Sequence, residues 1–307
     1  MFGFSTYNYE HFSRGLLEEM AEAPFAGPGP GDRAPDFQAA TLEGEPLRLS
    51  DFQGKKNVLL LFGSATCPMT AFSIGRINQL YDRFRGDEIE FLFIYVREAH
   101  PGEQIRAHRS NAAKRDAARL LRDEEEIRMP VLVDDVRGSV HRKYSRLPSP
   151  AFLIDRSGRV AFRSMWARPE AVESAIEELL QRQQERGVDH VVVNGGQDLS
   201  EPFSYAKLSA YRALERGGED SLNDFREALG FPGRAFTASR AVKSLVGNPR
   251  RVVAVGALTA AVLAGGLYAG FELRKRRLGA RRNPYRAYEK VAGRDAETGT
   301  DYGAVGI

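Results

Sequence analysis

The sequence predicts an α/β domain, in which a central mixed sheet is flanked by helices, followed by a C-terminal helical extension and one transmembrane helix. The first observation behind this prediction is the alternation of short apolar runs with amphipathic segments over residues 34–187. The second is a lone cysteine, Cys67, between an apolar run and a helical pattern. The third is a stretch of twenty uncharged residues, 252–271, with arginines on both sides.

Strands and helices are expected to alternate along the domain. The segments predicted as strands are 37–42, 46–49, 57–62, 90–96, 130–133, 151–155 and 159–164. Helices are predicted after Cys67, in the charged stretch 103–126, and at 169–184. The order is a strand pair, then strand, helix, strand, helix, strand, hairpin and helix. This is the order of a thioredoxin-like fold with helices on both faces of the sheet.

Composition divides the chain into parts with different expected roles. A Pro- and Gly-rich stretch, 23–35, is predicted to be a linker, and 188–249 to be a helical connector to the membrane with no chemistry of its own. Helical segments in the connector are expected at 205–216 and 222–229, with breaks at 217–218 and 231–233. The predicted parts are an N-terminal segment and linker (1–33), a thioredoxin-like domain (34–187), the connector (188–249), the transmembrane helix (250–273) and a basic tail (274–307).

The uncharged stretch and the tail predict a single-pass membrane protein. The arginines that flank residues 252–271 are typical of a transmembrane helix, and Gly266 and Gly270 have the spacing that permits a homodimer. The basic tail is suited to contact anionic membrane lipid. Because residues 1–22 lack the pattern of a signal peptide, the domain at residues 34–187 is expected in the cytoplasm.

Charge and cysteine content exclude several classes of function. The chain has a net charge of +3, and residues 272–290 alone carry +6, so the remainder carries about −3 and no basic stripe for nucleic acid. One cysteine excludes an intramolecular disulfide. With scattered histidines and one cysteine there is no zinc spacing, and no metal or bound cofactor is expected.

Cys67 is predicted to be a reactive thiol at a helix N-terminus. Pro68 suits the first turn of a helix, where unpaired N–H groups and the helix dipole favour a thiolate. The alternative is a buried, inert cysteine. Because Thr70 stands where a second cysteine would resolve a mixed disulfide, dithiol exchange is excluded. A single thiolate can still attack a peroxide oxygen or a halogen, and an external thiol can regenerate it.

Glu98 and His100 directly follow the second central strand. Because the carboxyl ends of parallel strands meet at one edge of a sheet, His100 is expected near Cys67, as a proton donor or a stabiliser of the thiolate. The alternative is a loop histidine that hydrogen-bonds to local backbone groups. Judged alone, His108 on the following stretch is a solvent-facing residue.

Two segments, 62–68 and 91–101, resemble the iodothyronine deiodinases, selenoenzymes with selenocysteine at the position of Cys67. The similarity covers roughly residues 57–165 and continues in order through several shorter segments, which are 105–109, 117–121, 130–134, Tyr144, 147–148 and 152–154.

This resemblance implies a thioredoxin fold and the reductive dehalogenation of an iodinated aromatic, with the sulfur of Cys67 attacking iodine. It also implies that His100 and His108 bind substrate or relay protons, and that Thr66 and Pro68 shape the turn of the nucleophile. Supporting residues are expected among the other matching positions, which are Glu98, Arg109 and Pro148.

Two departures from the family pattern bear on the chemistry. Cys67 replaces selenocysteine, and a thiolate is the weaker partner for iodine, so a slower reaction is expected. Ala65 stands where the family often has a second cysteine used in regeneration. Regeneration would then depend entirely on an outside thiol such as thioredoxin or glutathione.

The leading hypothesis is therefore a membrane-tethered thiol oxidoreductase resembling the deiodinases, with Cys67 as nucleophile and His100 as proton donor. A one-cysteine peroxidase is the second reading, because Ser64 matches the peroxiredoxin pattern although Leu60 stands where that pattern has proline. A non-enzymatic, membrane-bound adaptor with a thioredoxin fold is the third.

Overall fold

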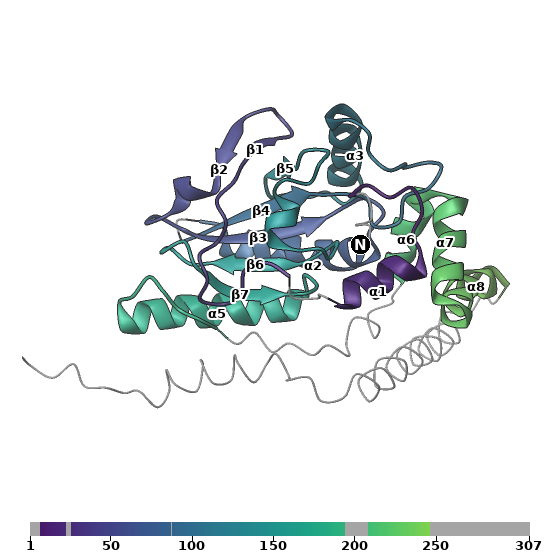
Figure 1. Ribbon diagram of the computed structural model, residues 1–307. Helices are drawn as coiled ribbons and strands as arrows, with labels where there is room; N and C mark the ends of the chain where they lie inside the picture. Colours follow the sequence, from purple (N-terminus) through teal and green to yellow (C-terminus); the bar gives the residue numbers. More distant parts are fainter. Residues whose placement is uncertain (1–6, 23–25, 87, 194–207, 246–307) are drawn as a thin grey trace, which may run out of the picture. The chain divides into compact units, whose positions relative to one another are not determined.

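The computed structural model describes residues 7–22, 26–86, 88–193 and 208–245 (Figure 1). All the predicted strands are present: β1 (Gln38–Thr41), β2 (Pro46–Arg48), β3 (Asn57–Gly63), β4 (Ile89–Tyr95), β5 (Val131–Val133), β6 (Ala151–Ile154) and β7 (Val160–Ser164). They form one sheet in the order β2-β1-β5-β4-β3-β6-β7. β3 pairs in parallel with β4, and β4 with β5, whereas the other pairs are antiparallel. The predicted mixed sheet is confirmed.

The central strands are buried on both faces, which explains their continuous apolar sequences. In β3, Leu59 and Leu61 belong to one core cluster, whereas Val58, Leu60 and Phe62 belong to the other. This division follows from the alternation of side chains along a strand.

The long helices of the domain pack against the Leu59 face. They are α2 (Pro68–Phe84), α3 (Asn111–Glu124) and α5 (Pro169–Arg186), and each contributes side chains to the cluster that contains Leu59. Because β3, β4 and β5 follow one another across the sheet, right-handed crossovers bring α2 and α3 to the same face. The prediction of helices on both faces is therefore wrong for the long helices. The other face is covered by loops, the 3₁₀ turn η1 (Leu49–Phe52) and the single turn α4 (His141–Tyr144).

One boundary matters for the site. The helix expected in residues 103–126 begins only at Asn111, because the Ser110 side chain accepts a hydrogen bond from Ala113 N and caps it. Residues 97–110 therefore form a loop after β4. This loop carries Glu98, His100 and His108.

Further helices precede and follow the domain. They are α1 (Arg14–Glu22), α6 (Leu208–Gly217), α7 (Glu219–Leu229) and α8 (Phe231–Leu245). α6 packs against α2, and α7 contacts both α6 and α1 (Figure 1). The break expected at 231–233 lies at Gly230, which has a φ of 64°, and Phe231 already begins α8.

The stretch predicted as a linker is held against the sheet edge where it is described. Gly31 N donates to Val160 O (2.8 Å), and Val160 N donates to Asp32 O (2.9 Å). These bonds pair the stretch with β7, the edge strand.

The predicted transmembrane helix and basic tail lie outside the described residues. Among the helices that the structure does describe, none combines the length and apolar character needed to cross a membrane.

Candidate active site

Cys67 lies between the end of β3 and the start of α2, as predicted. It is the N-cap residue of α2, with Pro68 in the first turn. Cys67 N donates to Ser64 O (3.2 Å), which closes a tight turn, and Cys67 O accepts from Ala71 N (3.1 Å). The residue is only 1% exposed.

The buried carboxylate of Glu98 accepts hydrogen bonds from the turn that precedes Cys67. Glu98 Oε2 accepts hydrogen bonds from Thr66 N (2.9 Å) and Thr66 Oγ1 (2.7 Å). Glu98 Oε1 accepts from His108 Nε2 (2.8 Å) and from the Tyr95 hydroxyl. The Tyr95 hydroxyl also accepts from Ala65 N (3.2 Å). Glu98 thus links both residues that precede Cys67 to His108.

The protonation state of Glu98 follows from these donors. Burial alone would raise the pKa of its carboxyl, but the hydrogen bonds and charge of His108, with the Tyr95 and Thr66 bonds, lower the pKa below its ordinary value. The carboxylate is therefore ionised at neutral pH. His108, which the sequence alone placed in solvent, is 4% exposed and part of this network.

Two further bonds join the Cys67 turn to the loop after β4. Thr66 Oγ1 accepts from His100 N (3.0 Å), and Ser64 Oγ accepts from Ala99 N (3.2 Å). His100 and Cys67 therefore lie at the same edge of the sheet, as the strand order predicted.

His100 is enclosed by aromatic rings. Its ring lies 4.1 Å from that of Phe12 and 5.5 Å from that of Phe225, measured between centroids. Its Nδ1 is buried and has no hydrogen-bond partner among the described residues. Burial lowers the pKa of His100 to about 3, so the imidazole is neutral at neutral pH.

Burial also governs the thiol. It raises the pKa of Cys67 above its ordinary value, although the Thr70 side chain and the backbone N–H groups of Thr70 and Met69 act in the opposite direction. The helix N-terminus was predicted to favour a thiolate. In this enclosed arrangement the loss of solvent outweighs it.

Two of the predicted supporting residues lie outside the network. Arg109 is on the surface, where it pairs with Glu10 (2.8 Å). Pro148 is buried in the loop before β6, near the end of β3, since Phe62 N donates to Pro150 O (3.1 Å).

The sequence did not indicate several residues of the site. Of these residues, only Tyr95 could have been identified from the sequence, because a tyrosine in an apolar strand needs a hydrogen-bond partner for its hydroxyl. Arg216 of α6 carried no signal, yet its Nη1 donates to Ala65 O (3.0 Å), 151 positions away in the chain. Phe12 and Phe225 likewise come from segments for which no chemistry was expected.

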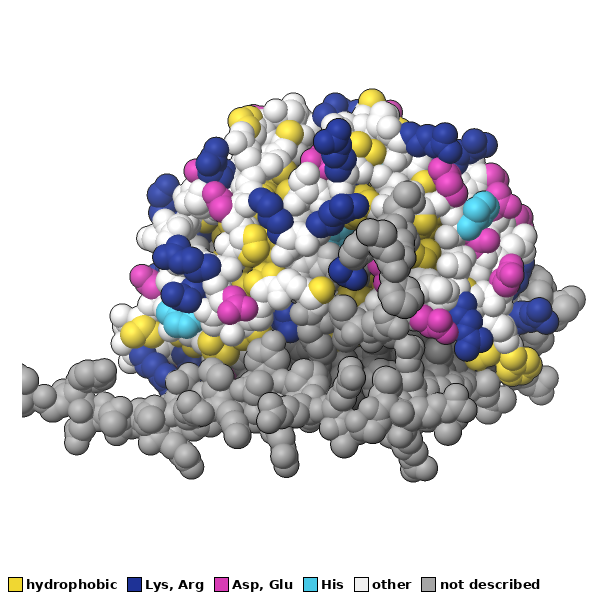
Figure 2. Space-filling view, in the orientation of Figure 1, with side chains coloured by type: hydrophobic (Ala, Val, Ile, Leu, Met, Phe, Trp, Pro, Cys, Tyr) yellow, Lys and Arg dark blue, Asp and Glu magenta, His cyan; other side chains and the backbone are white. Residues whose placement is uncertain are grey.

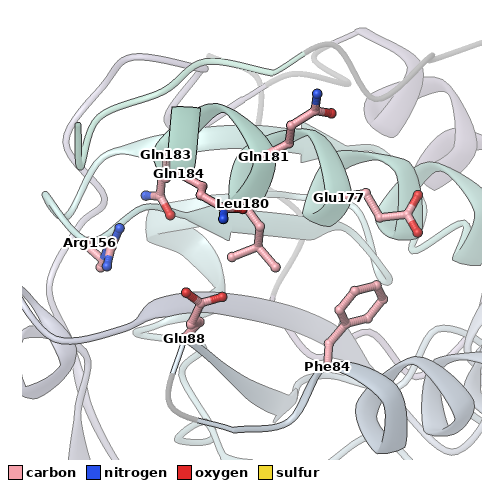
Figure 3. Close-up of a pocket in the computed structure, with 8 residues that line it drawn as sticks. All are labelled: Phe84, Glu88, Arg156, Glu177, Leu180, Gln181, Gln183 and Gln184. Carbon is pink, nitrogen blue, oxygen red and sulfur yellow. The ribbon is translucent and has the colours of Figure 1, made fainter. Parts of the chain in front are cut away.

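A separate hollow of about 620 Å³ lies at the opposite end of β3. Gln183 in its wall hydrogen-bonds to Asn57, the first residue of β3, whereas Cys67 follows the last. Figure 3 shows its lining, which is Phe84, Glu88, Arg156, Glu177, Leu180, Gln181, Gln183 and Gln184. It is therefore not part of the Cys67 site.

Within the described ranges, no group of three His, Cys, Asp or Glu side chains is arranged to hold a metal ion. On the face shown in Figure 2, basic and acidic side chains are interspersed.

The curated relatives include two kinds of protein, deiodinases and thiol-disulfide oxidoreductases. The chain is 31% identical to type I iodothyronine deiodinase of Xenopus laevis over 187 residues, which is 57% of this chain and 72% of that one. It is 27% identical to thiol-disulfide oxidoreductase ResA of Bacillus thuringiensis over 131 residues, 42% of this chain and 66% of that one. Thyroxine 5-deiodinase of Rattus norvegicus is 31% identical over 102 residues, which cover 30% of this chain and a third (33%) of that one.

Among solved structures, a putative thiol:disulfide interchange protein DsbE from Chlorobium tepidum is 24% identical. The match covers 50% of this chain and 98% of that chain, with a TM-score of 0.41. Residues 30–163, which contain β1 to β7 and the Cys67 turn, match the AhpC/TSA family. The domain formed by these residues, with its mixed sheet and with Cys67 at the start of α2, therefore belongs to the AhpC/TSA family.

Proposed function

We propose that this protein is a single-cysteine thiol oxidoreductase that carries out the reductive dehalogenation of an iodinated aromatic ring. The observation that carries the proposal is the position of Cys67 on a turn held by the buried network of Glu98, Thr66, Tyr95 and His108. The similarity to a deiodinase over 72% of that protein supports the choice of substrate class. Thiol-disulfide exchange within the chain is not available, because Cys67 is its only cysteine.

The proposed reaction has two stages. In the first, the sulfur of Cys67 attacks iodine, the S–I bond forms, and the C–I bond breaks. The electron pair of that bond stays on the ring carbon, which takes up a proton. In the second, two molecules of an external thiol such as glutathione, or one dithiol such as reduced thioredoxin, reduce the sulfenyl iodide. They leave as a disulfide, iodide and a proton are released, and the Cys67 thiol is restored.

The network provides a path for the proton. His108 Nε2 and the Thr66 hydroxyl both bond to the same carboxylate, that of Glu98. Of the residues in this path, Thr66 is the one that directly precedes Cys67 in the chain. His100, neutral and with a free Nδ1, is suited to hydrogen-bond to the substrate rather than to protonate it strongly.

The direct test is iodide release from an iodinated phenol in the presence of dithiothreitol. We expect the wild-type chain to release iodide catalytically, and Cys67→Ser to show only the rate of dithiothreitol alone. Glu98→Gln keeps the shape of the side chain but removes the charge, and is expected to lower kcat by 10²-fold or more, in the range typical of general acid–base groups. Equal iodide release by wild type and Cys67→Ser would refute the proposal.

A second candidate function is a one-cysteine peroxidase, favoured by the AhpC/TSA match over residues 30–163. Cys67 would attack one peroxide oxygen, giving a sulfenic acid and water, and external thiols would restore the thiol. The raised pKa of Cys67 disfavours rapid attack on peroxide and on iodine alike, so it does not choose between the two candidates. Trapping of the sulfenic acid after addition of hydrogen peroxide distinguishes the two candidates, since a peroxidase forms it within seconds and at substoichiometric peroxide.

We also propose that residues 250–273 anchor the protein in a membrane, with Cys67 on the cytoplasmic side, the basic tail against anionic lipid, and a homodimer through the glycine pair. Labelling of Cys67 by a membrane-impermeant thiol reagent in lysed but not in intact cells is the expected result. A Cys67 that no reagent reaches even after substrate addition would favour the non-enzymatic adaptor.

A further inference from the structure

Cys67, Glu98 and His100 are 1%, 2% and 7% exposed, so the structure encloses all three groups. Part of the enclosing wall comes from outside the region that matches the AhpC/TSA family, residues 30–163. One contribution is the N-terminal arm, residues 7–12. The other is the pair of cap helices, α6 and α7.

The cap helices are bound to both sides of the site. On one side, Arg216 donates to Ala65 O in the Cys67 turn, while its other nitrogens bind Glu124 and Glu125 beside the end of α3. Its side chain is only 9% exposed. On the other side, Gln104 N donates to Gly217 O (3.1 Å), and Glu103 accepts from Asp220 N (2.8 Å) at the start of α7.

The junction between α6 and α7 depends on close approach of backbones. A Cβ on Gly217 would lie 2.7 Å from His100 O, and a Cβ on Gly102 would lie 2.3 Å from Gly217 O. Glycine is needed at both positions for this contact to form. The cap helices therefore lie directly on the loop that carries His100.

The N-terminal arm approaches the same loop. The Tyr9 hydroxyl donates to Ala99 O (2.8 Å), and the Phe12 ring packs at a tilt against the ring of His100. The end of the arm is anchored by Tyr7, whose ring lies 5.1 to 5.6 Å from three cationic groups. These are the guanidinium groups of Arg97 and Arg142 and the Lys114 ammonium, an arrangement that favours the face of an aromatic ring.

The N-terminal arm and the cap helices also contact each other next to His100. Asp224 of α7 accepts hydrogen bonds from Phe12 N and from His11 Nδ1, each 3.1 Å long. Next to Asp224, Phe225 contacts His100, so the histidine ring touches one aromatic residue from the arm and one from the cap helices. Ala228 packs with Tyr9, Phe12 and Leu16 in a small apolar cluster.

We propose that the N-terminal arm and the cap helices form a two-part gate over Cys67, and that Arg216 and Asp224 are its latches. In the closed gate Arg216 is also a positioning residue, because it holds the Ala65 carbonyl of the nucleophile's turn. Opening would separate the arm from α7 at Asp224 and expose the His100 loop and Cys67, while the sheet stays folded. The inference rests on the proposed function only in taking Cys67 as the reacting group.

The experiment measures access to Cys67 in the folded, full-length chain. Iodoacetamide is added in excess and the adduct is followed by mass spectrometry, which is unambiguous because the chain has one cysteine. We expect alkylation of the folded chain to be at least about 100-fold slower than in concentrated urea, since it requires an opening event. Asp224→Ala and Arg216→Lys should each accelerate it about tenfold, because each loses charge-assisted hydrogen bonds that only the closed gate makes.

The matched control is Arg212→Lys. Arg212 lies on the same helix as Arg216 and pairs with the same Glu125, but its side chain is 54% exposed and makes no hydrogen bond to the Cys67 turn. Its alkylation rate should stay within about twofold of wild type. Hydrogen exchange separates gate opening from unfolding: in the two latch variants the amides of Phe12 and Gln104 should exchange faster, while those of β3 and β4 remain protected.

Three results would overturn the inference. The first is alkylation of Cys67 in the wild-type chain at the rate seen in urea. The second is a Cys67 in the Asp224→Ala and Arg216→Lys variants that is alkylated no faster than in Arg212→Lys. The third is faster alkylation in these variants accompanied by a loss of hydrogen-exchange protection in β3 and β4. Slow, latch-dependent alkylation, together with no release of iodide from the iodinated phenol in the separate activity assay, would instead support the gate and refute the proposed dehalogenation.

Discussion

At the scale of single residues, Glu98 connects the chemistry to the fold. A carboxylate that is 2% exposed costs free energy to bury, and only its donors compensate for that cost. Because these donors are Thr66, Tyr95 and His108, the same bonds that keep Glu98 charged also hold the turn before Cys67.

Replacing Glu98 should therefore lower stability as well as activity. Glu98→Gln leaves at least one donor without an acceptor, and we expect the free energy of unfolding to fall by about 2 kcal/mol. The matched control is Glu90→Gln on β4, the strand that leads to Glu98, where a partly exposed pair with Lys56 is removed and a change of about 0.5 kcal/mol or less is expected. Urea unfolding of both variants checks this, and equal losses would contradict the assigned role.

Two buried histidines predict how stability depends on pH. Burial lowers the pKa of both His100 and His141 to about 3, so the folded chain keeps them neutral while the unfolded chain protonates them near pH 6.5. The unfolded state then binds more protons, and stability must fall as the pH drops from about 6.5 toward 3. Each histidine contributes a slope of at most about 1.4 kcal/mol per pH unit.

Urea unfolding between pH 7.5 and 4.5 measures this slope. His100→Gln should lower the slope of the unfolding free energy against pH by the contribution of one histidine, and His141→Gln should lower it by the same amount. A slope that neither substitution changes would show that other groups are responsible.

At the scale of elements, the sequence predicted most of the sheet and little of what encloses the site. The strands were predictable because β3, β4 and β6 are continuous apolar runs that only a buried position explains. The start of α3 was not predictable, because one hydrogen bond from Ala113 N to the Ser110 side chain decides it within a long charged stretch. The contact between Arg216 and Ala65 left no pattern in the sequence, since it joins a polar helix to a backbone carbonyl far away in the chain.

Two glycines in helices illustrate the difference between local and tertiary constraints. Nothing lies within 4 Å of a Cβ added to Gly75 in α2, so Gly75→Ala should stabilise the chain by about 0.5–1 kcal/mol through helix propensity. Gly217→Ala should instead destabilise it, because the added methyl meets the His100 carbonyl. Urea unfolding of the two variants should give shifts of opposite sign, and a stabilising Gly217→Ala would mean that α6 can move away from the loop at little cost.

At the scale of the whole molecule, the described chain combines a strongly buried sheet with segments attached mainly by polar contacts. β3 and β4 are buried along almost their entire length. The arm and the cap helices depend on individual bonds at Tyr9, Arg216 and Asp224. Such differences in local burial produce different local stabilities within one fold.

Native-state hydrogen exchange should resolve this hierarchy. The amides of Leu60 and Leu92 are expected to exchange only with global unfolding. The amide of Phe12, which bonds to the Asp224 side chain, should exchange through a smaller opening with a weak dependence on denaturant. Identical exchange free energies for all three amides would indicate that the described chain opens as one unit.

The enclosure of Cys67 has a consequence for its lifetime in an oxidising cell. A thiol oxidised to sulfenic acid is rescued when a second thiol, from the same chain or from outside, captures it, and without capture it proceeds to irreversible sulfinic and sulfonic acids. This chain has no second cysteine to perform that rescue. A resting thiol that is 1% exposed and has a raised pKa is protonated and out of reach of peroxide. Burial thus supplies the protection against over-oxidation that a resolving cysteine provides elsewhere.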